Sequence, residues 1–241
     1  IPELRNALET IYTLTGEKID ILGFDACLMA MLEVVYACRD YIDYVVASEE
    51  MTCGWPYGDI LWALASDPDM EPLDLAKVIV QEYIERYTTF IDDPYATISV
   101  VDVSAVVEKL IPALNQLTGY LLRNYDSYQS AVSTADQNTE TFGTSGSYYK
   151  DLGHFLELLY NAINDERGKE LVKMTLNSYN ESVIYNAHLT AHPNASGISI
   201  YLDDYYPWTY YYLSFSDHNQ WDEFILRYSG TVPEAWFYDI G

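Results

Sequence analysis

The sequence predicts an α/β fold in which a mostly parallel sheet is covered by helices on both faces. Three apolar runs, at 19–24, 44–48 and 97–101, are too short for helices and indicate buried strands. Segments with helical spacing of their apolar residues separate these runs. Strands that alternate with helices are typical of a parallel sheet, because parallel neighbours need a helix-length connection.

Helices are expected between the strands of this first half. A stripe of apolar residues over 2–15 predicts the first helix, since Pro2 suits its first turn and Gly16 lies just past its end. The same spacing predicts three further helices, over 28–38, 73–90 and 103–125. Pro112 is expected to kink the last of them.

The pattern is looser beyond residue 125. Residues 126–147 are rich in Ser, Thr, Asn and Gln, and the tail 138–147 is expected to be a surface loop. The aromatic tract 205–212 is expected to pack against the body of the domain. The other expected elements are helices at 151–164 and 169–180, strands at 183–190 and 197–202, and a short amphipathic helix at 220–228.

The composition is that of an acidic, globular chain of 241 residues. Hydrophobic residues make up 49% of it, which excludes a disordered chain. The 37 acidic and 12 basic side chains give a formal net charge of -25, which repels nucleic acid and anionic membranes. Basic peptides would be attracted, although solvation of an exported protein explains the charge equally well. No apolar run has membrane-spanning length, and no signal peptide is visible.

Cys27 lies where the first predicted strand ends, the position at which open α/β sheets bind ligands. A helix that starts directly after Cys27 would place its positive end at the thiol and favour the thiolate. Asp25 is separated from Cys27 by one residue, so an extended backbone would point both side chains to the same side. The alternative is a structural pair, with Cys27 buried and Asp25 stabilising the helix N-terminus. Three cysteines are too few for a disulfide framework, although Cys38 and Cys53 could pair.

The next strand would deliver Glu49 and Glu50 to the same edge of the sheet as Asp25. They are weaker candidates for substrate binding, because surface carboxylates are common in so acidic a chain. The Gly- and Pro-punctuated loop that follows carries Trp55 and Tyr57, which we expect in a pocket wall.

Several sequence blocks occur in an order and spacing that resemble one family over nearly the whole chain. The blocks are Phe24-Asp25-Ala26-Cys27-Leu28-Met29 with Glu33, Ala47-Ser48-Glu49-Glu50, Gly54-Trp55-Pro56-Tyr57-Gly58, Tyr149-Lys150-Asp151-Leu152-Gly153-His154-Phe155, Ala195-Ser196-Gly197-Ile198-Ser199-Ile200-Tyr201-Leu202, and Leu213-Ser214-Phe215 running into Trp221-Asp222-Glu223-Phe224. Together they are similar to the clostripain family of cysteine peptidases. This resemblance implies a caspase-like three-layer α/β sandwich.

The resemblance also implies the chemistry. Cys27 would be the nucleophile of a cysteine endopeptidase, and Asp25 would bind the Arg or Lys side chain before the scissile bond. Glu49, Glu50 and Trp55 would line the substrate site. No cofactor or metal is required by this mechanism. Some relatives depend on calcium, and the abundant carboxylates permit it, although no loop has calcium-ligand spacing.

The chain departs from the family pattern at the catalytic histidine. Members of the family take it from a His-Gly turn at the end of the strand that precedes the Cys strand, but no His precedes Cys27. All four histidines lie downstream, and each is expected to be structural or at the surface: His154, His188, His192 and His218. His188 is the least implausible substitute, because it lies in a predicted strand.

Two explanations follow for the absent histidine. The first is that the chain is the heavy part of a peptidase cut shortly before Ile1, and that an N-terminal light segment carries the His. The second is a complete chain that forms a non-catalytic, caspase-like binding or interaction domain. The first is favoured, because Asp25 and Cys27 retain the family's chemical pattern.

These expectations define a single sandwich made of two sequence segments. Residues 1–125 would form its nucleophile-bearing part, and 126–241 would supply C-terminal helices and strands that pack on the same domain. The expected partners are peptides or proteins with basic residues, together with the light segment, and neither nucleic acid nor a membrane. The resemblance implies an extracellular or cell-envelope location.

Overall fold

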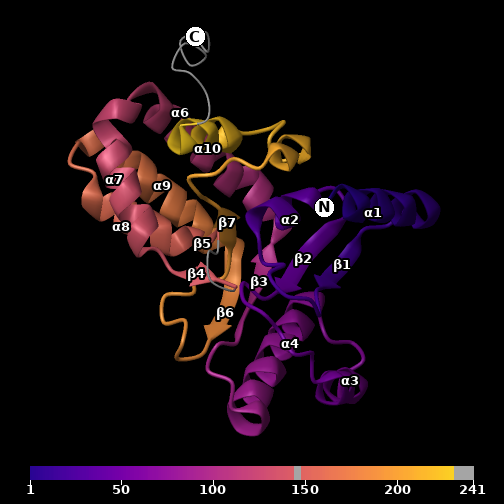
Figure 1. The fold of residues 1–241 in the computed structure, drawn as a ribbon. Coiled ribbons are helices and arrows are strands. Elements are labelled where there is room, and N and C mark those ends of the chain that lie inside the picture. Colours follow the sequence, from indigo (N-terminus) through magenta and orange to yellow (C-terminus); the bar gives the residue numbers. More distant parts are fainter. Residues whose placement is uncertain (144–147, 231–241) are drawn as a thin grey trace.

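The computed structural model describes residues 1–143 and 148–230 and has a four-stranded sheet at its centre (Figure 1). The strands β1 (Ile19–Gly23), β2 (Ile42–Ala47), β3 (Thr97–Asp102) and β6 (Val183–His188) lie side by side in the order β1-β2-β3-β6. β1 is parallel to β2, whereas β3 is antiparallel to both of its neighbours. Three of the four strands therefore run in one direction, and β3 runs in the other. The apolar pattern of β3 could not show this reversal, because a strand buried on both faces has the same pattern in either direction.

Helices cover both faces of this sheet, as the α/β prediction required. α4 (Pro72–Arg86) crosses all four strands on one face and packs beside α3 (Tyr57–Ser66). On the other face, α5 (Val103–Ala105) packs on β2 and α9 (Glu166–Ser182) packs on β6. The side chains of β2 alternate between these layers, since Val45 belongs to one core cluster and Val46 to the other.

A second, smaller sheet lies beside the first. It consists of β4 (Thr141–Phe142), β5 (Tyr149–Asp151) and β7 (Ser199–Tyr201), all antiparallel. The predicted surface loop at 138–147 is therefore partly a strand, and its residues 144–147 lie outside the described residues. The two strands expected at 183–190 and 197–202 exist as β6 and β7, but they belong to different sheets.

The remaining helical segments surround these sheets. They are α1 (Pro2–Thr15), α2 (Leu32–Ala37), α6 (Ile111–Arg123), α7 (Tyr125–Asn138), α8 (Leu152–Ala162), α10 (Trp221–Ser229), two π-helical turns at Tyr87–Ile91 and Val106–Leu110, and a 3-10 turn at Trp208–Tyr212. The helix predicted over 103–125 is interrupted by the second π turn, which ends two residues before Pro112. Proline lacks the amide that an α-helix needs and crowds the carbonyl four residues earlier, so the widened turn relieves both conflicts.

The aromatic tract packs on the core with only part of its side chains. Tyr206 and Tyr210 are buried, and the Tyr210 hydroxyl donates a 2.7 Å hydrogen bond to Glu33, which is itself buried. Other rings of the tract remain exposed: Tyr205, Trp208, Tyr211 and Tyr212. The expected packing is thus confirmed for Tyr206 and Tyr210 and not for the exposed rings.

Gly197 joins the two sheets at a crowded point, which yields a stability prediction. Its backbone φ is +116°, and a Cβ there would lie 2.9 Å from Val183 Cγ1 and 3.0 Å from Ser99 Cβ. We expect Gly197→Ala to lower the free energy of unfolding by about 2–4 kcal/mol, from backbone strain and overpacking together. Gly16→Ala is the control, because Gly16 also has a positive φ but nothing within 4 Å of the added methyl. It should cost about 1 kcal/mol. Equal losses in urea unfolding would contradict the packing argument.

Candidate functional site

Cys27 is exposed in a turn just beyond β1, and the expectation that a helix starts directly after it is wrong. Leu28 adopts a left-handed backbone, with φ of 60°. The next two amides, of Met29 and Ala30, each donate 3.0 Å hydrogen bonds to the Ser48 carbonyl. The chain thus pairs with the end of β2 instead of coiling, and α2 begins only at Leu32. The N-terminus of α2 therefore does not lie at the thiol.

The polar contacts of the Cys27 sulfur come instead from the loop after β2. The Thr52 amide donates to Cys27 Sγ at 3.3 Å, and the thiol lies 3.6 Å from the Thr52 carbonyl. Thr52 is fixed by two stacked tyrosines, since its Oγ1 lies 3.0 Å from the Tyr83 hydroxyl and 3.2 Å from the Tyr87 hydroxyl. An amide N–H directed at sulfur stabilises negative charge there. All three cysteines are free thiols, so the Cys38–Cys53 pair considered above is not formed.

Asp25 is exposed and contacts the same loop five residues beyond Thr52. The Tyr57 hydroxyl donates a 2.9 Å hydrogen bond to Asp25 Oδ2. This bond, foremost among the causes, raises the pKa of Tyr57. A Cβ at Gly54 would lie 3.9 Å from both carboxylate oxygens. Trp55 covers Gly23, at the end of β1, and its ring centroid lies 6.4 Å from that of Tyr57. The structure therefore brings Cys27, Asp25 and Trp55 to one loop.

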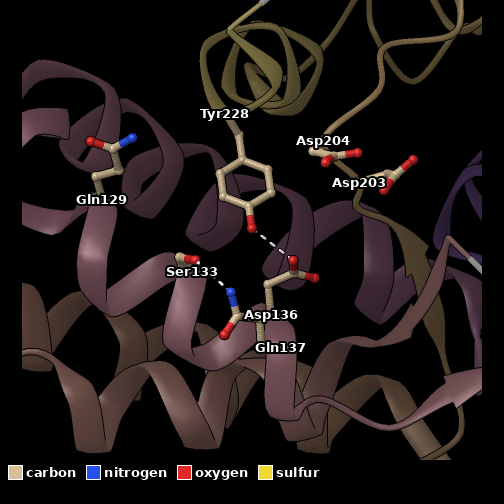
Figure 2. A pocket seen from close by; sticks show the side chains of 7 residues that line it. All are labelled: Gln129, Ser133, Asp136, Gln137, Asp203, Asp204 and Tyr228. Atoms are coloured by element: carbon tan, nitrogen blue, oxygen red, sulfur yellow. Dashed lines mark hydrogen bonds between the residues drawn. The ribbon is translucent and has the colours of Figure 1, made fainter.

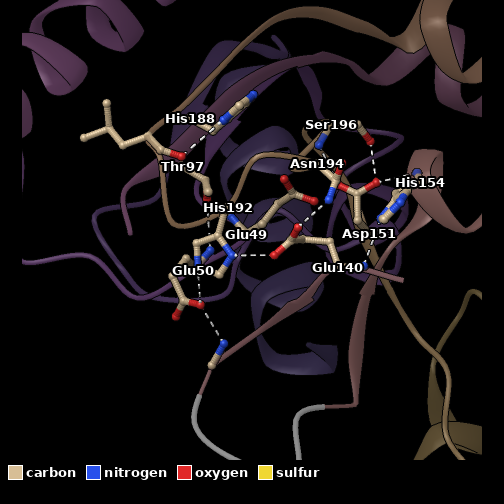
Figure 3. A network of polar contacts seen from close by, with 12 residues as sticks. Glu49, Glu50, Thr97, Glu140, Asp151, His154, His188, His192, Asn194 and Ser196 are labelled. Carbon is tan, nitrogen blue, oxygen red and sulfur yellow. Dashed lines mark hydrogen bonds and ion pairs between the residues drawn. The ribbon is translucent and has the colours of Figure 1, made fainter. Parts of the chain in front are cut away.

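Glu49 and Glu50 lie elsewhere, in the interior, where they are only 1% and 4% exposed (Figure 3). Glu49 Oε2 accepts a 3.0 Å hydrogen bond from the Gly197 amide. Burial, and then the neighbouring Asp151 carboxylate, raise the pKa of Glu49 well above its ordinary value. Burial also raises the pKa of Asp151, whose carboxylate accepts hydrogen bonds from Ser196 and from the His154 amide. Two adjacent buried carboxyl groups favour sharing one proton.

Glu50 is part of an ion-pair chain centred on His192 (Figure 3). His192 Nε2 lies 3.2 Å from Glu50 Oε2, and His192 Nδ1 lies 3.0 Å from Glu140 Oε1. Burial opposes the imidazolium, but the two carboxylates outweigh it and raise the pKa of His192. Burial likewise opposes the charge of Glu50, yet the contact with His192 and the hydrogen bonds from the Met51 and Gly143 amides hold the pKa of Glu50 below its ordinary value. The Met51 amide donates at 2.7 Å, so this network supports the loop that carries Thr52.

None of the four histidines contacts Cys27 or Asp25 within residues 1–143 and 148–230. His154 accepts from the Glu140 amide, His218 contacts the Ser214 carbonyl, and His192 is occupied as described. His188 lies at the end of β6, three strand spacings from β1, or about 14 Å. The sequence blocks alone could not have distinguished the buried Glu49 and Glu50 from the exposed Asp25, because all three follow strands at one edge of the sheet.

A further cavity of about 400 Å³ lies away from this loop, between α7, α10 and the segment after β7 (Figure 2). No sequence pattern predicted this cavity. In its acidic wall, the Asp136 carboxylate already has partners within the protein. It pairs with Lys150 at 2.9 Å and accepts a 2.7 Å hydrogen bond from the Tyr228 hydroxyl. Within the described residues, no group of three or more His, Cys, Asp or Glu side chains is arranged to hold a metal ion.

Comparison with known families and structures identifies the fold. The sequence model of the clostripain family matches residues 1–228. A clostripain from Bacteroides thetaiotaomicron, solved with the peptide inhibitor BTN-VLTK-AOMK, is 22% identical with a TM-score of 0.61, and the match covers 92% of each chain. None of the curated proteins compared with the chain matches it.

Two other solved structures are similar over part of their own length. An inactive zymogen of a protease from Parabacteroides distasonis is 21% identical with a TM-score of 0.62, covering 90% of this chain and 62% of that one. A secreted cysteine protease from Bacteroides thetaiotaomicron is 24% identical with a TM-score of 0.56, covering 78% of this chain and 51% of that one. At these identities the likeness shows the caspase-like fold that the sequence blocks implied.

The charge on His192 generates a pH prediction. Its pKa is higher in the folded chain than the ordinary 6.5, so its contribution to stability is fully present below that value and is lost as pH rises through the folded pKa. We therefore expect the urea midpoint to fall as pH is raised above 6.5 and through the folded pKa of His192. His192→Gln should flatten this dependence and lower stability on the acidic side. His188→Gln, at an exposed position, should leave the profile unchanged. Identical profiles for the two variants would contradict the ion-pair assignment.

Proposed function

The chain belongs to the clostripain family of cysteine peptidases, and on this premise we propose that it carries the nucleophile of an endopeptidase that cleaves after Arg or Lys. One observation carries the proposal. Cys27 and Asp25 are both exposed at the carboxyl end of β1, and one loop, 52–57, contacts both of them.

Cys27 would act as a thiolate that attacks the carbonyl carbon of the scissile bond. The C–N bond then breaks, the amine leaves with a proton from a general acid, and water hydrolyses the thioester. The backbone amide of Cys27 would supply part of the oxyanion hole. In the described part of the chain this amide donates to no other group, which supports the assignment. The mechanism requires no cofactor.

The general acid and base would be a histidine on a segment that adds to the edge of the sheet at β1. β1 pairs with β2 alone among the described strands, and its side chains at Ile19, Ile21 and Leu22 are only half-buried. A strand added there would lie about 4.8 Å from β1 and would end beside Cys27. The light segment proposed as a partner fits this position.

Asp25 would bind the basic side chain of the substrate, since a carboxylate pairs with Arg or Lys by charge-assisted hydrogen bonds. The net charge of -25 supports attraction of basic peptides. The inhibitor bound to the similar Bacteroides thetaiotaomicron protein contains VLTK, a sequence that ends in lysine. Because Glu49 and Glu50 are enclosed, we assign them to support of the loop and not to contact with substrate.

An extracellular or cell-envelope location agrees with the description of one similar protease as secreted. None of the helices in the described residues combines the length and apolar character that crossing a membrane requires. The rival function is a non-catalytic binding domain, which the lack of any histidine contact to Cys27 in the described part would suit.

The nucleophile assignment predicts that Cys27→Ala abolishes peptidase activity of the complete protein. Loss of a covalent nucleophile typically costs about 10³-fold or more in kcat. Cys53→Ala is the matched control, since Cys53 is an exposed thiol on the adjacent loop that has no assigned role. It should retain activity on Arg and Lys peptides. Retention of activity by Cys27→Ala, with unchanged circular dichroism in both variants, would contradict the nucleophile assignment, whereas a complete parent protein without peptidase activity would support the binding-domain hypothesis.

The specificity assignment predicts that Asp25→Asn weakens cleavage after basic residues selectively. The lost charge pair should lower kcat/KM for Arg and Lys peptides by about 10- to 100-fold, while peptides with norleucine at the same position change little. The measurement is kcat/KM for the three peptides on each protein. An equal loss on basic and neutral peptides would mean that Asp25 supports the structure.

A further inference from the structure

The hydroxyl of Tyr57 has a polar contact that packing does not require. Tyr57 is 53% exposed, and its hydroxyl donates to Asp25 Oδ2 at 2.9 Å across 32 positions of sequence. Pairs this exposed contribute little to stability, because water competes for both partners. The contact therefore suits a role in placing the carboxylate better than a role in holding the fold.

Hydrogen bonds hold the backbone next to both residues of this contact. Tyr57 is the first residue of α3, and Pro56 before it is buried and accepts backbone hydrogen bonds from Asp59 and Ile60. Asp25 follows Phe24, the first residue after β1, and the Phe24 amide donates a 2.9 Å hydrogen bond to the Val46 carbonyl. A hydrogen bond between two such anchored positions restricts rotation of the Asp25 carboxylate.

The other side of the carboxylate is left open. In the described residues, Asp25 Oδ1 accepts no hydrogen bond, and the hydrogen at Gly54 leaves space where a Cβ would come within 3.9 Å of both oxygens. The neighbouring residue, Trp55, packs its ring against Gly23, two positions before Asp25. Aromatic faces attract cations and cover the methylene stem of a lysine side chain.

We propose that Tyr57 is the positioning residue for basic-side-chain recognition, fixing the Asp25 carboxylate through Oδ2 so that Oδ1 points to the incoming cation. This inference rests on the proposed function and adds to it a second residue that determines specificity. A carboxylate held in one orientation loses less rotational freedom when it binds an ammonium or guanidinium group. Without the hydroxyl, Asp25 keeps its charge but has to be ordered by the substrate.

The test is alkylation of Cys27 by two peptidyl chloromethyl ketones that differ only in lysine or norleucine beside the reactive group. The thiolate displaces chloride and forms a thioether, which intact mass records over time. The complete protein is used with Cys53→Ala, so that Cys27 is the only exposed thiol among the described cysteines. The measured quantity is the ratio of the two second-order rate constants, lysine over norleucine.

We expect Tyr57→Phe to lower this ratio by about 3- to 10-fold, the range for loss of one ordinary hydrogen bond, with the norleucine rate constant unchanged. Asp25→Asn should bring the ratio near one, and the double variant should match Asp25→Asn alone, because Tyr57 acts through Asp25. Tyr211→Phe, at an exposed ring that contacts Tyr212, should behave as the parent protein.

Three outcomes would overturn the positioning role: an unchanged ratio in Tyr57→Phe, an equal loss with both reagents, or a double variant that falls by the product of the single effects. A parent protein without lysine preference, unaffected by Asp25→Asn, would instead overturn the proposed specificity itself. The two failures are therefore distinguishable.

Discussion

Burial of two consecutive glutamates, Glu49 and Glu50, is the constraint on which the functional edge depends. A buried carboxyl group needs a partner for each oxygen or a proton, and these two find their partners in segments that are distant in sequence. Glu49 reaches the Gly197 amide and Asp151, and Glu50 reaches the Gly143 amide and His192. The end of β2 is thereby connected to residues in or next to the strands of the second sheet.

The backbone of residues 48–50 also shapes the turn that carries Cys27. The Ser48 carbonyl accepts the amides of Met29 and Ala30, and the Glu50 carbonyl accepts the amide of Leu28 at 3.2 Å. These bonds replace the helical ones that the apolar spacing suggested, and they leave Cys27 outside any helix. Backbone hydrogen bonds hold the turn in place, and Thr52 contacts the thiol itself. Cys27 is therefore exposed and yet fixed in position. This combination is what a nucleophile requires.

The carboxyl groups of the protein include enclosed groups and exposed groups. Some carboxyl groups, such as Glu33, Glu49 and Asp151, are enclosed and have raised pKa values because burial disfavours their charge. Asp25 is exposed and keeps one oxygen open toward solvent. The formal net charge therefore counts enclosed carboxyl groups whose ionisation burial disfavours. The negative charge that a basic substrate would meet lies at the end of β1.

The sequence by itself determined the strands and most helices, because apolar periodicity survives in a single chain. It located α1, β3 and α10 within a few residues, and its blocks placed Cys27 and Asp25 at the end of a strand. It could not decide strand direction, because an apolar run buried on both faces does not encode direction. It also could not locate the start of α2, which begins only at Leu32. It also could not separate Glu49 and Glu50 from Asp25, since all three follow a strand. Only the tertiary structure decided which carboxylates are enclosed, because enclosure depends on residues such as Gly143, His192 and Gly197 that reach this edge from far along the chain.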